Sequence, residues 1–331
     1  MKHKLFNLLK VLAFFALGVV IFWLVYKDQD IDRIKSILAN DVNYFWVWVS
    51  LFLGLLSHIS RTIRWVIMIE PLGQRPRLLN TFLAVMVGYL MNLVIPRMGE
   101  ISRCGVLARY EKISFTKLVG TVVTERIVDV IMLLLLTVVV IVTQFGKLIQ
   151  FLENNPGVSA KLEHITFSPG MILALIIAIV SFYLFRRKIR NSAFYHKIQG
   201  VMSKFGEGLR TIRTMKNKWA FILHTVFIWL MYYLMTYVVF FSFEFTTHLS
   251  AIAALTTFVL GSFGMVAPVQ GGIGAWHFMV IQSLIVYGIS KADGVVFAFL
   301  AHSSMTGMLI LMGLISLSIL PFINRRKSES L

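Results

Sequence analysis

The stretch NLVIPRMGEISR, from Asn92 to Arg103, closes an apolar run that is long enough to resemble a membrane helix. Within it, Pro96 and Gly99 stand next to three charged side chains. Proline inside a helix removes a backbone hydrogen bond and collides with the preceding turn, so the helix must break here. How the chain places this break relative to a membrane decides the fold.

The composition is that of a protein that crosses a membrane several times. Of the 331 residues, 58% are hydrophobic and 14% are charged, and the mean hydropathy is +0.79. No polar stretch is long enough to form an ordinary soluble domain. We therefore expect one all-α, polytopic membrane domain over residues 1–331, without a separate soluble catalytic domain.

Six segments are long and apolar enough to cross the hydrocarbon core, which takes about 20 helical residues. No small-residue cleavage site follows the first of them, so we interpret it as a retained helix and not as a signal peptide. The six expected spans are 8–26, 44–69, 118–143, 170–185, 219–241 and 294–320.

The distribution of basic residues decides how the Pro96 segment is placed. If 81–96 crossed the membrane alone, the basic segments 97–117 and 186–218 would both lie outside, although Lys and Arg near a membrane prefer the cytoplasmic side. We therefore expect residues 81–112 to form a hairpin that enters and leaves on the cytoplasmic face. The protein is then a multi-pass protein of the cytoplasmic membrane with both termini in the cytoplasm.

The net charge of +17 becomes, in this topology, a coat on the cytoplasmic face. Such a coat holds the chain against an anionic leaflet, at about 1 kcal/mol per basic residue. Anionic membrane lipids are therefore the expected partners, and nucleic acid is not. The segment 186–218 has the pattern of an amphipathic helix on the membrane surface. It either fixes the topology or captures lipid headgroups directly.

A second broken segment lies at 250–288, where GSFGMVAPVQGGIG interrupts an apolar run with five glycines and a proline. Irregular backbone persists at membrane depth only inside protein or against a water-filled cavity. The count of spans makes this hairpin enter from the outside, opposite to the first. The expected structural breaks are Pro96, Gly99, Pro268, Gly271, Gly272 and Gly274.

The two hairpins suggest an inverted repeat. Residues 44–143 and 219–320 would each contain a span, a broken hairpin and a span. Transporters with this arrangement bind their substrate near the middle of the membrane, where half-helices end. Two ordinary kinked helices in a packed bundle would produce the same pattern.

The stretch TVVTERIVDVIMLLLL places charges at the start of an apolar span. Glu125 and Asp129 share a helix face, and Arg126 can pair with Asp129. Charged groups in a span cost about 2.5–3.5 kcal/mol each, so they must be paired, buried in protein or in contact with water. Arg97 and Arg103 are the expected partners. The cluster either ties the hairpin to the next helix or offers positive charge to an anion such as a lipid phosphate.

Other polar residues give weaker signals. His58, Arg61 and Arg64 lie along one helix near its cytoplasmic end, where snorkelling of the long side chains to the interface accounts for the arginines. His277 and His302 are either hydrogen-bonded core histidines or proton carriers.

Three polar residues lie close to the breaks. Asn92, Ser262 and Gln270 either bind substrate or cap backbone groups that the breaks leave free. Cys104, the single cysteine, has no partner for an intramolecular disulfide.

The residues from Asn92 to Leu136 resemble the proline and G-E-x-x-R motif and the following G-T-V-x-x-E-R-x-x-D helix of the lysylphosphatidylglycerol synthetase transmembrane, or flippase-like, family. APVQGGIGAWH resembles that family's late glycine-rich turn, except that Gln270 replaces a proline and His277 replaces a glutamate. The resemblance covers about residues 10–320. Its motifs match Pro96, Gly99, Glu100, Arg103, Glu125, Arg126 and Asp129.

The resemblance implies a domain that moves lipids between leaflets, including aminoacylated phosphatidylglycerol or polyprenyl-linked precursors. The aminoacyl-transferring domain of the family's longer members is absent from this sequence, so lipid synthesis is not implied. We therefore expect a lipid flippase or transporter, without a metal, a cofactor or catalytic residues. The candidate substrate-binding residues are Arg97, Glu100, Arg103, Glu125, Arg126, Asp129, Gln270 and His277.

Two other functions remain open. Buried acids and arginines also suit an integral-membrane enzyme that acts on lipid-linked substrates, although no zinc-protease or serine-hydrolase motif is present. A non-transporting scaffold would use the basic coat alone. The sequence has no P-loop for ATP, so transport would be driven by a gradient, by protons or by the membrane potential.

Overall fold

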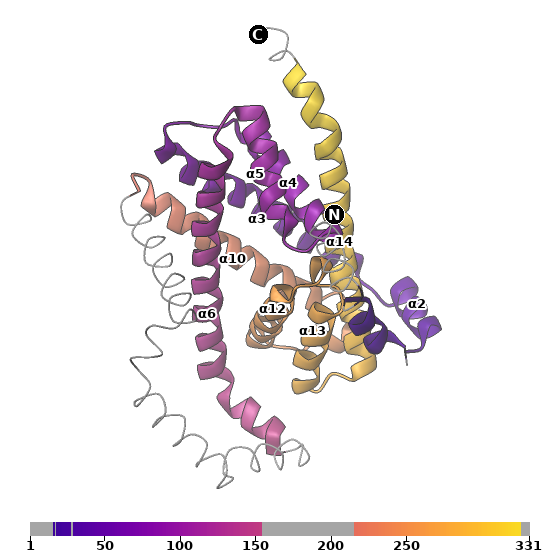
Figure 1. The fold of residues 1–331 in the computed structure, drawn as a ribbon. Helices are drawn as coiled ribbons and strands as arrows, with labels where there is room; N and C mark the ends of the chain where they lie inside the picture. Colours follow the sequence, from indigo (N-terminus) through magenta and orange to yellow (C-terminus); the bar gives the residue numbers. More distant parts are fainter. Residues whose placement is uncertain (1–15, 17, 28, 154–214, 326–331) are drawn as a thin grey trace, which may run out of the picture. The chain divides into compact units, whose positions relative to one another are not determined.

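The computed structural model describes residues 16, 18–27, 29–153 and 215–325, and their regular secondary structure is entirely helical (Figure 1). The predicted all-α fold is thus confirmed. The expected span 170–185 lies outside the described residues, as do residues 186–214 of the basic segment. Of the expected first span, residues 18–26 are described, and they are helical.

The chain forms two compact units, residues 1–140 with 215–331 and residues 141–214. Of the second unit, the structure describes only 141–153, which is the end of a long helix. All contacts below lie within the first unit.

Four helices in the described part of the chain are long and apolar enough to cross a membrane. They begin and end within a few residues of the expected spans, except that the second continues past residue 143. They are α3 (Tyr44–Ile69), α6 (Phe115–Glu153), α10 (Lys218–Phe240) and α14 (Lys291–Asn324). Each exposes large apolar side chains to its surroundings, as lipid contact requires, among them Trp48, Leu135, Leu223 and Leu311.

The first expected hairpin is a pair of helices separated by the Pro96 break. The helix α4 (Leu78–Val94) ends two residues before the proline, and α5 (Met98–Glu111) begins two residues after it. Arg97, between them, has a φ of 63°, a left-handed conformation that reverses the chain at the cost of some strain.

Two glycines let α4 and α5 cross in direct backbone contact. A Cβ atom at Gly99 would lie 2.2 Å from the carbonyl oxygen of Gly88, which is far inside any van der Waals separation. The backbone N–H of Gly99 donates a hydrogen bond of 2.7 Å to Oδ1 of Asn92. Asn92 therefore caps a backbone group that the break leaves free.

The second expected hairpin consists of α12 (Ala251–Val266), the short helix η2 (Gln270–Gly272) and α13 (Ala275–Val286). Gly271, Gly272 and Gly274 have φ values of 56°, 77° and 79°, which L-residues with side chains rarely adopt. At Gly264, a Cβ atom would lie 2.7 Å from the Cα atom of Trp276. The glycines thus permit both the turn and the close contact of its two arms.

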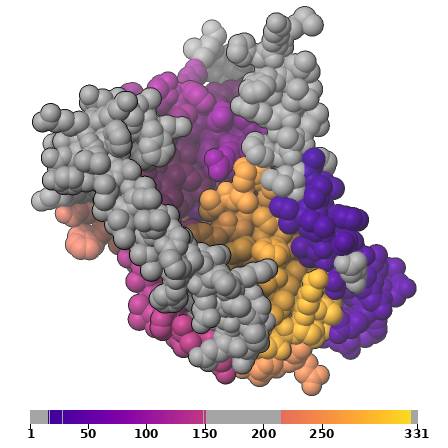
Figure 2. Space-filling model, turned by 60° about the horizontal axis from the view of Figure 1, so that its bottom comes forward, coloured from indigo at the N-terminus to yellow at the C-terminus, as the bar shows by residue number. Residues whose placement is uncertain are grey.

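The tips of the two hairpins meet. A Cβ atom at Gly271 would lie 2.5 Å from Cδ2 of Leu93, near the end of α4. In addition, Nη2 of Arg97 lies 3.5 Å from the carbonyl oxygen of Val266. Figure 2 shows the purple surface of the first hairpin beside the orange surface of the second.

The two hairpins open toward opposite ends of α14. With 34 residues, α14 is about 50 Å long at 1.5 Å per residue. Its last residue, Asn324, is hydrogen-bonded to Asn80 at the start of α4, whereas its first residue follows closely after the end of α13. A long helix, a broken hairpin and a second long helix follow one another twice in the chain, first as α3 to α6 and then as α10 to α14 (Figure 1). The two hairpins point in opposite directions, as in an inverted repeat.

This arrangement predicts that the open ends of the hairpins lie on opposite sides of the membrane. Single cysteines at Arg109, near the end of α5, and at Thr247, just before α12, should react with a membrane-impermeant maleimide from opposite sides of sealed vesicles. Both side chains are exposed, and the native Cys104 is buried, so the unmodified protein serves as the unlabelled control. Labelling of both positions from the same side would contradict the opposed arrangement.

The helix crossing predicts a sharp difference between two glycines of α5. Gly99→Ala should lower the free energy of unfolding by about 1–3 kcal/mol, because the added methyl group forces the two helices apart. Gly105 has no atom within 4 Å of an added Cβ, so Gly105→Ala should instead be neutral or stabilising by up to about 1 kcal/mol. Thermal unfolding in detergent measures both. Equal effects of the two substitutions would show that the crossing is not tight.

Candidate functional site

Three helices bring a cluster of charged side chains together inside the first unit. Two arginines come from α3, an acid and an arginine from the first turns of α5, and two acids and an arginine from the first half of α6. The charged cluster consists of Arg61, Arg64, Glu100, Arg103, Glu125, Arg126 and Asp129.

Glu125 is the centre of the charged cluster. It is fully buried, and it forms ion pairs with three arginines from two other helices. Its Oε1 atom contacts Nη1 of Arg61 and, at 3.1 Å, Nη2 of Arg64. Its Oε2 atom lies 3.0 Å from Nη2 of Arg103. One carboxylate therefore joins α3, α5 and α6.

Asp129 repeats this pairing one turn further along α6. Its Oδ1 atom lies 3.0 Å from Nη2 of Arg64, and its Oδ2 atom lies 3.4 Å from Nη1 of Arg61. Arg64 is completely buried, and its other terminal nitrogen donates to Thr225 of α10 at 3.2 Å. Residues three or four apart lie on one helix face, so two arginines of α3 oppose two acids of α6.

Aromatic side chains surround the arginines and exclude water from them. The guanidinium of Arg103 lies 4.7 Å from the ring centroid of Trp65, within the range of a cation–π interaction. The indole N–H of Trp65 donates to Thr121 at 2.9 Å, which fixes the ring. Burial strengthens the ion pairs that Arg61, Arg64 and Arg103 form with the acids of α6.

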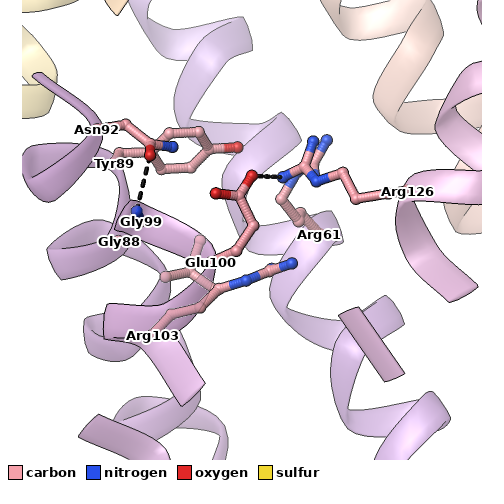
Figure 3. A pocket seen from close by; sticks show the side chains of 9 residues that line it. Arg61, Gly88, Tyr89, Asn92, Gly99, Glu100, Arg103 and Arg126 are labelled. Carbon is pink, nitrogen blue, oxygen red and sulfur yellow. Dashed lines mark hydrogen bonds and ion pairs between the residues drawn. The ribbon is translucent and has the colours of Figure 1, made fainter. Parts of the chain in front are cut away.

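One ion pair of the charged cluster lies at its open edge. Glu100 and Arg126 are in contact at 3.2 Å, and 27% and 45% of their side chains are exposed. They line a pocket beside the Gly88–Gly99 crossing, into which Glu100 extends from α5 (Figure 3). The lining residues are Arg61, Val85, Gly88, Tyr89, Asn92, Gly99, Glu100, Arg103 and Arg126.

The charged cluster has more positive than negative charge. Its four arginines face three carboxylates. Moreover, within the described part of the chain, the Nε atoms of Arg61, Arg64 and Arg103 are buried without a hydrogen-bond partner. Unsatisfied buried donors are costly, so the cluster has both the charge and the donors to hold an additional anion.

The structure assembles five of the predicted site residues but not all eight. Glu100, Arg103, Glu125, Arg126 and Asp129 meet in the charged cluster. The predicted pairing of Arg97 with the acids of α6 is wrong. Arg97 precedes the first turn of α5 at the tip of the hairpin, and its guanidinium turns to the second hairpin instead.

Snorkelling does not explain Arg61 and Arg64. Only 5% of Arg61 and none of Arg64 is exposed, because carboxylates at the same depth on α6 draw both side chains inward. The sequence does contain a signal for this pairing. Arg61 and Arg64 lie three residues apart on one face of α3, and the acids of α6 lie four apart on one face of that helix, so the two pairs have complementary charge and spacing. However, nothing in the local sequence indicates that α3 and α6 are neighbours.

Gln270 and His277 lie at the second break and not in the charged cluster. Both are buried, with 4% and 2% of their surfaces exposed. Nδ1 of His277 accepts a hydrogen bond from the N–H of Gly274 at 3.3 Å, and Nε2 of His302 lies 2.9 Å from the carbonyl oxygen of Gly271. Both histidines therefore hold the backbone of the break. Ser262 donates to its own helix, at Phe258.

The charged cluster predicts very different costs for removing its two glutamates. Glu125→Gln should lower the free energy of unfolding by about 3–5 kcal/mol, because it leaves buried arginine charge uncompensated. Glu100→Gln removes a half-exposed pair and should cost no more than about 1 kcal/mol. Thermal unfolding in detergent compares them. If Glu125→Gln is as mild as Glu100→Gln, the charged cluster does not hold the helices together.

Comparison with known proteins identifies the family of the chain. A family model described as the lysylphosphatidylglycerol synthase TM region matches residues 8–313. A UPF0104 membrane protein of Methanocaldococcus jannaschii is 24% identical over 276 residues, which cover 78% of this chain and 80% of that protein. No solved structure matches the chain. The chain is therefore a multi-pass membrane protein that belongs to the lysylphosphatidylglycerol synthase transmembrane family.

Proposed function

We propose that the protein moves a lipid with an anionic, phosphate-containing headgroup between the leaflets of the cytoplasmic membrane, with both of its termini on the cytoplasmic side. The observation that carries the proposal is the positive surplus of the charged cluster beside a small pocket with a half-exposed edge. Phospholipids and polyprenyl-linked phosphates share the anionic phosphate that arginines bind.

The energetic problem of such transport is the headgroup. Moving a charged group into hydrocarbon costs many kcal/mol unless protein groups replace its water. Guanidinium groups suit this task because their planar N–H donors match two phosphate oxygens at once. In the pocket, Arg61, Arg103 and Arg126 are the arginines that line the open space.

The arginines have different roles in this mechanism. Glu125 and Asp129 hold Arg61 and Arg64 in fixed positions, so these donors need no reorganisation when an anion arrives. Arg126 pairs with Glu100 at the half-exposed edge and, at 3.5 Å, with the buried Asp129. Because an exposed pair such as Glu100–Arg126 contributes at most about 1 kcal/mol, a phosphate can compete with Glu100 for Arg126.

The position of the pocket supports transport. It lies beside the first break, and the tip of the second hairpin touches the end of α4 that carries Leu93. Transporters with inverted repeats bind their substrates where such half-helices meet. The pocket also faces the first turn of α5, whose N-terminal dipole favours an anion.

The proposal predicts that Arg126 is needed for transport but not for folding. In liposomes with a fluorescent phosphatidylglycerol, Arg126→Gln should slow the exchange between leaflets about tenfold or more, since hydrogen bonds to charged groups contribute about 1.5–3 kcal/mol. Arg109→Gln removes the same charge from an exposed position of α5 outside the pocket and should leave the rate unchanged. Dithionite quenching measures the exchange.

Three results would contradict the proposal. Equal exchange rates in Arg126→Gln and Arg109→Gln would show that transport does not depend on the charged cluster. A covalently altered lipid would indicate an integral-membrane enzyme. Lipid binding without any exchange between leaflets would indicate a scaffold.

A further inference from the structure

We propose that His277 and His302 form a proton-binding site at the second break, and that proton uptake opens this break. The inference goes beyond the proposed function, because binding of a proton here does not require the charged cluster to bind lipid. It rests on the arrangement of the two imidazoles and on the groups around them.

The two histidines form a close pair, in which His277 is buried and His302 is half-buried. Their ring centroids lie 4.5 Å apart, with His277 in the first turn of α13 and His302 on α14. The helix that contains residues 18–26 covers them. From it, Phe22 and Tyr26 approach His277 with ring-centroid distances of 5.6 and 5.7 Å.

The backbone contacts assign a lone pair or a proton to one nitrogen of each ring. Nδ1 of His277 accepts the N–H of Gly274, so this nitrogen carries a lone pair and no proton. Nε2 of His302 faces the carbonyl oxygen of Gly271, which can only accept, so this nitrogen carries a proton. Nδ1 of His302 lies 3.3 Å from the hydroxyl of Thr306, which can donate or accept. His277 is therefore neutral in the described arrangement, and His302 is neutral where the hydroxyl of Thr306 donates to its Nδ1 atom.

The pair can take up one proton from water at either Nδ1 atom, and the consequences differ. At His302 the new N–H points to the hydroxyl of Thr306, which rotates to accept it, and the bond to Gly271 remains. At His277 the new N–H replaces the acceptor that Gly274 needs, so that bond is lost. His302 is thus the primary proton acceptor, and His277 is the contact that fails when charge accumulates.

Among the described residues, no acid lies beside the pair to compensate a positive charge. α12, η2 and α13 contain no acidic or basic residue other than His277, and Tyr26 is the titratable group that the covering helix presents. The nearest acid of α14, Asp293, is nine residues before His302, or about 13 Å along the helix. The first hairpin contributes Arg97, a further cation, near Val266.

The sign of the pH effect follows from this environment. A buried imidazolium without a counter-charge is unfavourable, so the described, closed break binds fewer protons than an arrangement in which water reaches the pair. Lowering the pH therefore shifts the equilibrium toward the open break, because protons bind that state more tightly.

Opening of this break would reach the anion pocket through direct contacts. Gly271 bonds to His302 on one side and packs against Leu93 on the other. The preceding residue, Asn92, holds Gly99 at the wall of the pocket. Proton uptake at the histidine pair is thereby in a position to alter the site for the headgroup.

The protein contains a reporter of the pair. The ring of Trp276 lies 5.3 Å from that of His302 and 5.7 Å from that of His277, and an imidazolium quenches indole fluorescence at such distances. The fluorescence difference between the full-length protein and its Trp276→Phe variant isolates this tryptophan. As the pH falls from about 8 to about 5, this difference should decrease by about half or more with a single midpoint.

The same titration in variants tests the assignment. His302→Gln, which retains an N–H donor for Gly271, should abolish the pH-dependent decrease, whereas His277→Gln, which keeps the primary proton acceptor, should retain it. His248→Gln, at an exposed histidine next to α11 (Glu244–Thr247), should leave it unchanged. A decrease that persists in His302→Gln, or that is absent from the unmodified protein, would overturn the proton site.

A second measurement reads opening itself and is independent of fluorescence. The rate at which a cysteine at Ala267, in the break, reacts with a water-soluble maleimide is divided by the rate of a cysteine at the exposed Thr247 at the same pH, because the thiolate that reacts becomes scarcer as the pH falls. This ratio should be about tenfold higher near pH 5 than near pH 8, within the range in which histidine titrates. In the His302→Gln background the ratio should not rise in this way, and a pH-independent ratio with intact histidines would contradict opening.

Failure here and failure of the proposed function are distinguishable. The fluorescence titration should persist in Arg126→Gln, which is expected to lose lipid transport. If the fluorescence titration is observed but no protein, unmodified or variant, exchanges lipid between leaflets, the proton site stands and the proposed lipid transport is rejected.

Discussion

The carboxylate of Glu125 is the interaction on which the rest of the first unit depends. It is buried, and arginines from α3 and α5 converge on it. In a lipid environment none of these charges is stable alone, because breaking one member of a buried network leaves an uncompensated charge. The three helices must therefore come together as a set, and this requirement places the first hairpin against two long helices.

The glycine crossing satisfies the geometric side of the same requirement. Arg103 reaches Glu125 only because α5 lies in backbone contact with α4, where Gly88 and Gly99 meet. Any side chain at Gly99 would move α5 away and weaken the ion pair. The proline break and the glycine crossing thus have one consequence, which is to bring the start of α5, with its charges, to the charged cluster.

The sequence predicted the features that depend on local chemistry. Pro96 and the glycines near Gly271 break a helix in any tertiary surroundings, so both hairpins could be predicted from the sequence. The four described long helices could be predicted from the length and composition of their apolar segments. The partners of Glu125 were only partly accessible. Arg103 is on the helix that directly precedes α6 in the chain, so its pairing with Glu125 could be predicted. Arg61 and Arg64 reach Glu125 only because α3 packs against α6. Arg97 was misplaced because contact between the hairpin tips is a tertiary property.

The two breaks differ in the charge that they accommodate, and this difference bears on the energetics of transport. In the proposed mechanism, the first break presents surplus positive charge to an anion, whereas the second holds imidazoles that gain one proton. An anion that crosses alone works with or against the membrane potential, at about 2.3 kcal/mol per charge and 100 mV. One headgroup charge accompanied by one proton carries no net charge. The contact of Leu93 with Gly271 then joins an anion site to a proton site, which would make the movement of the pair independent of the membrane potential and dependent on the pH difference.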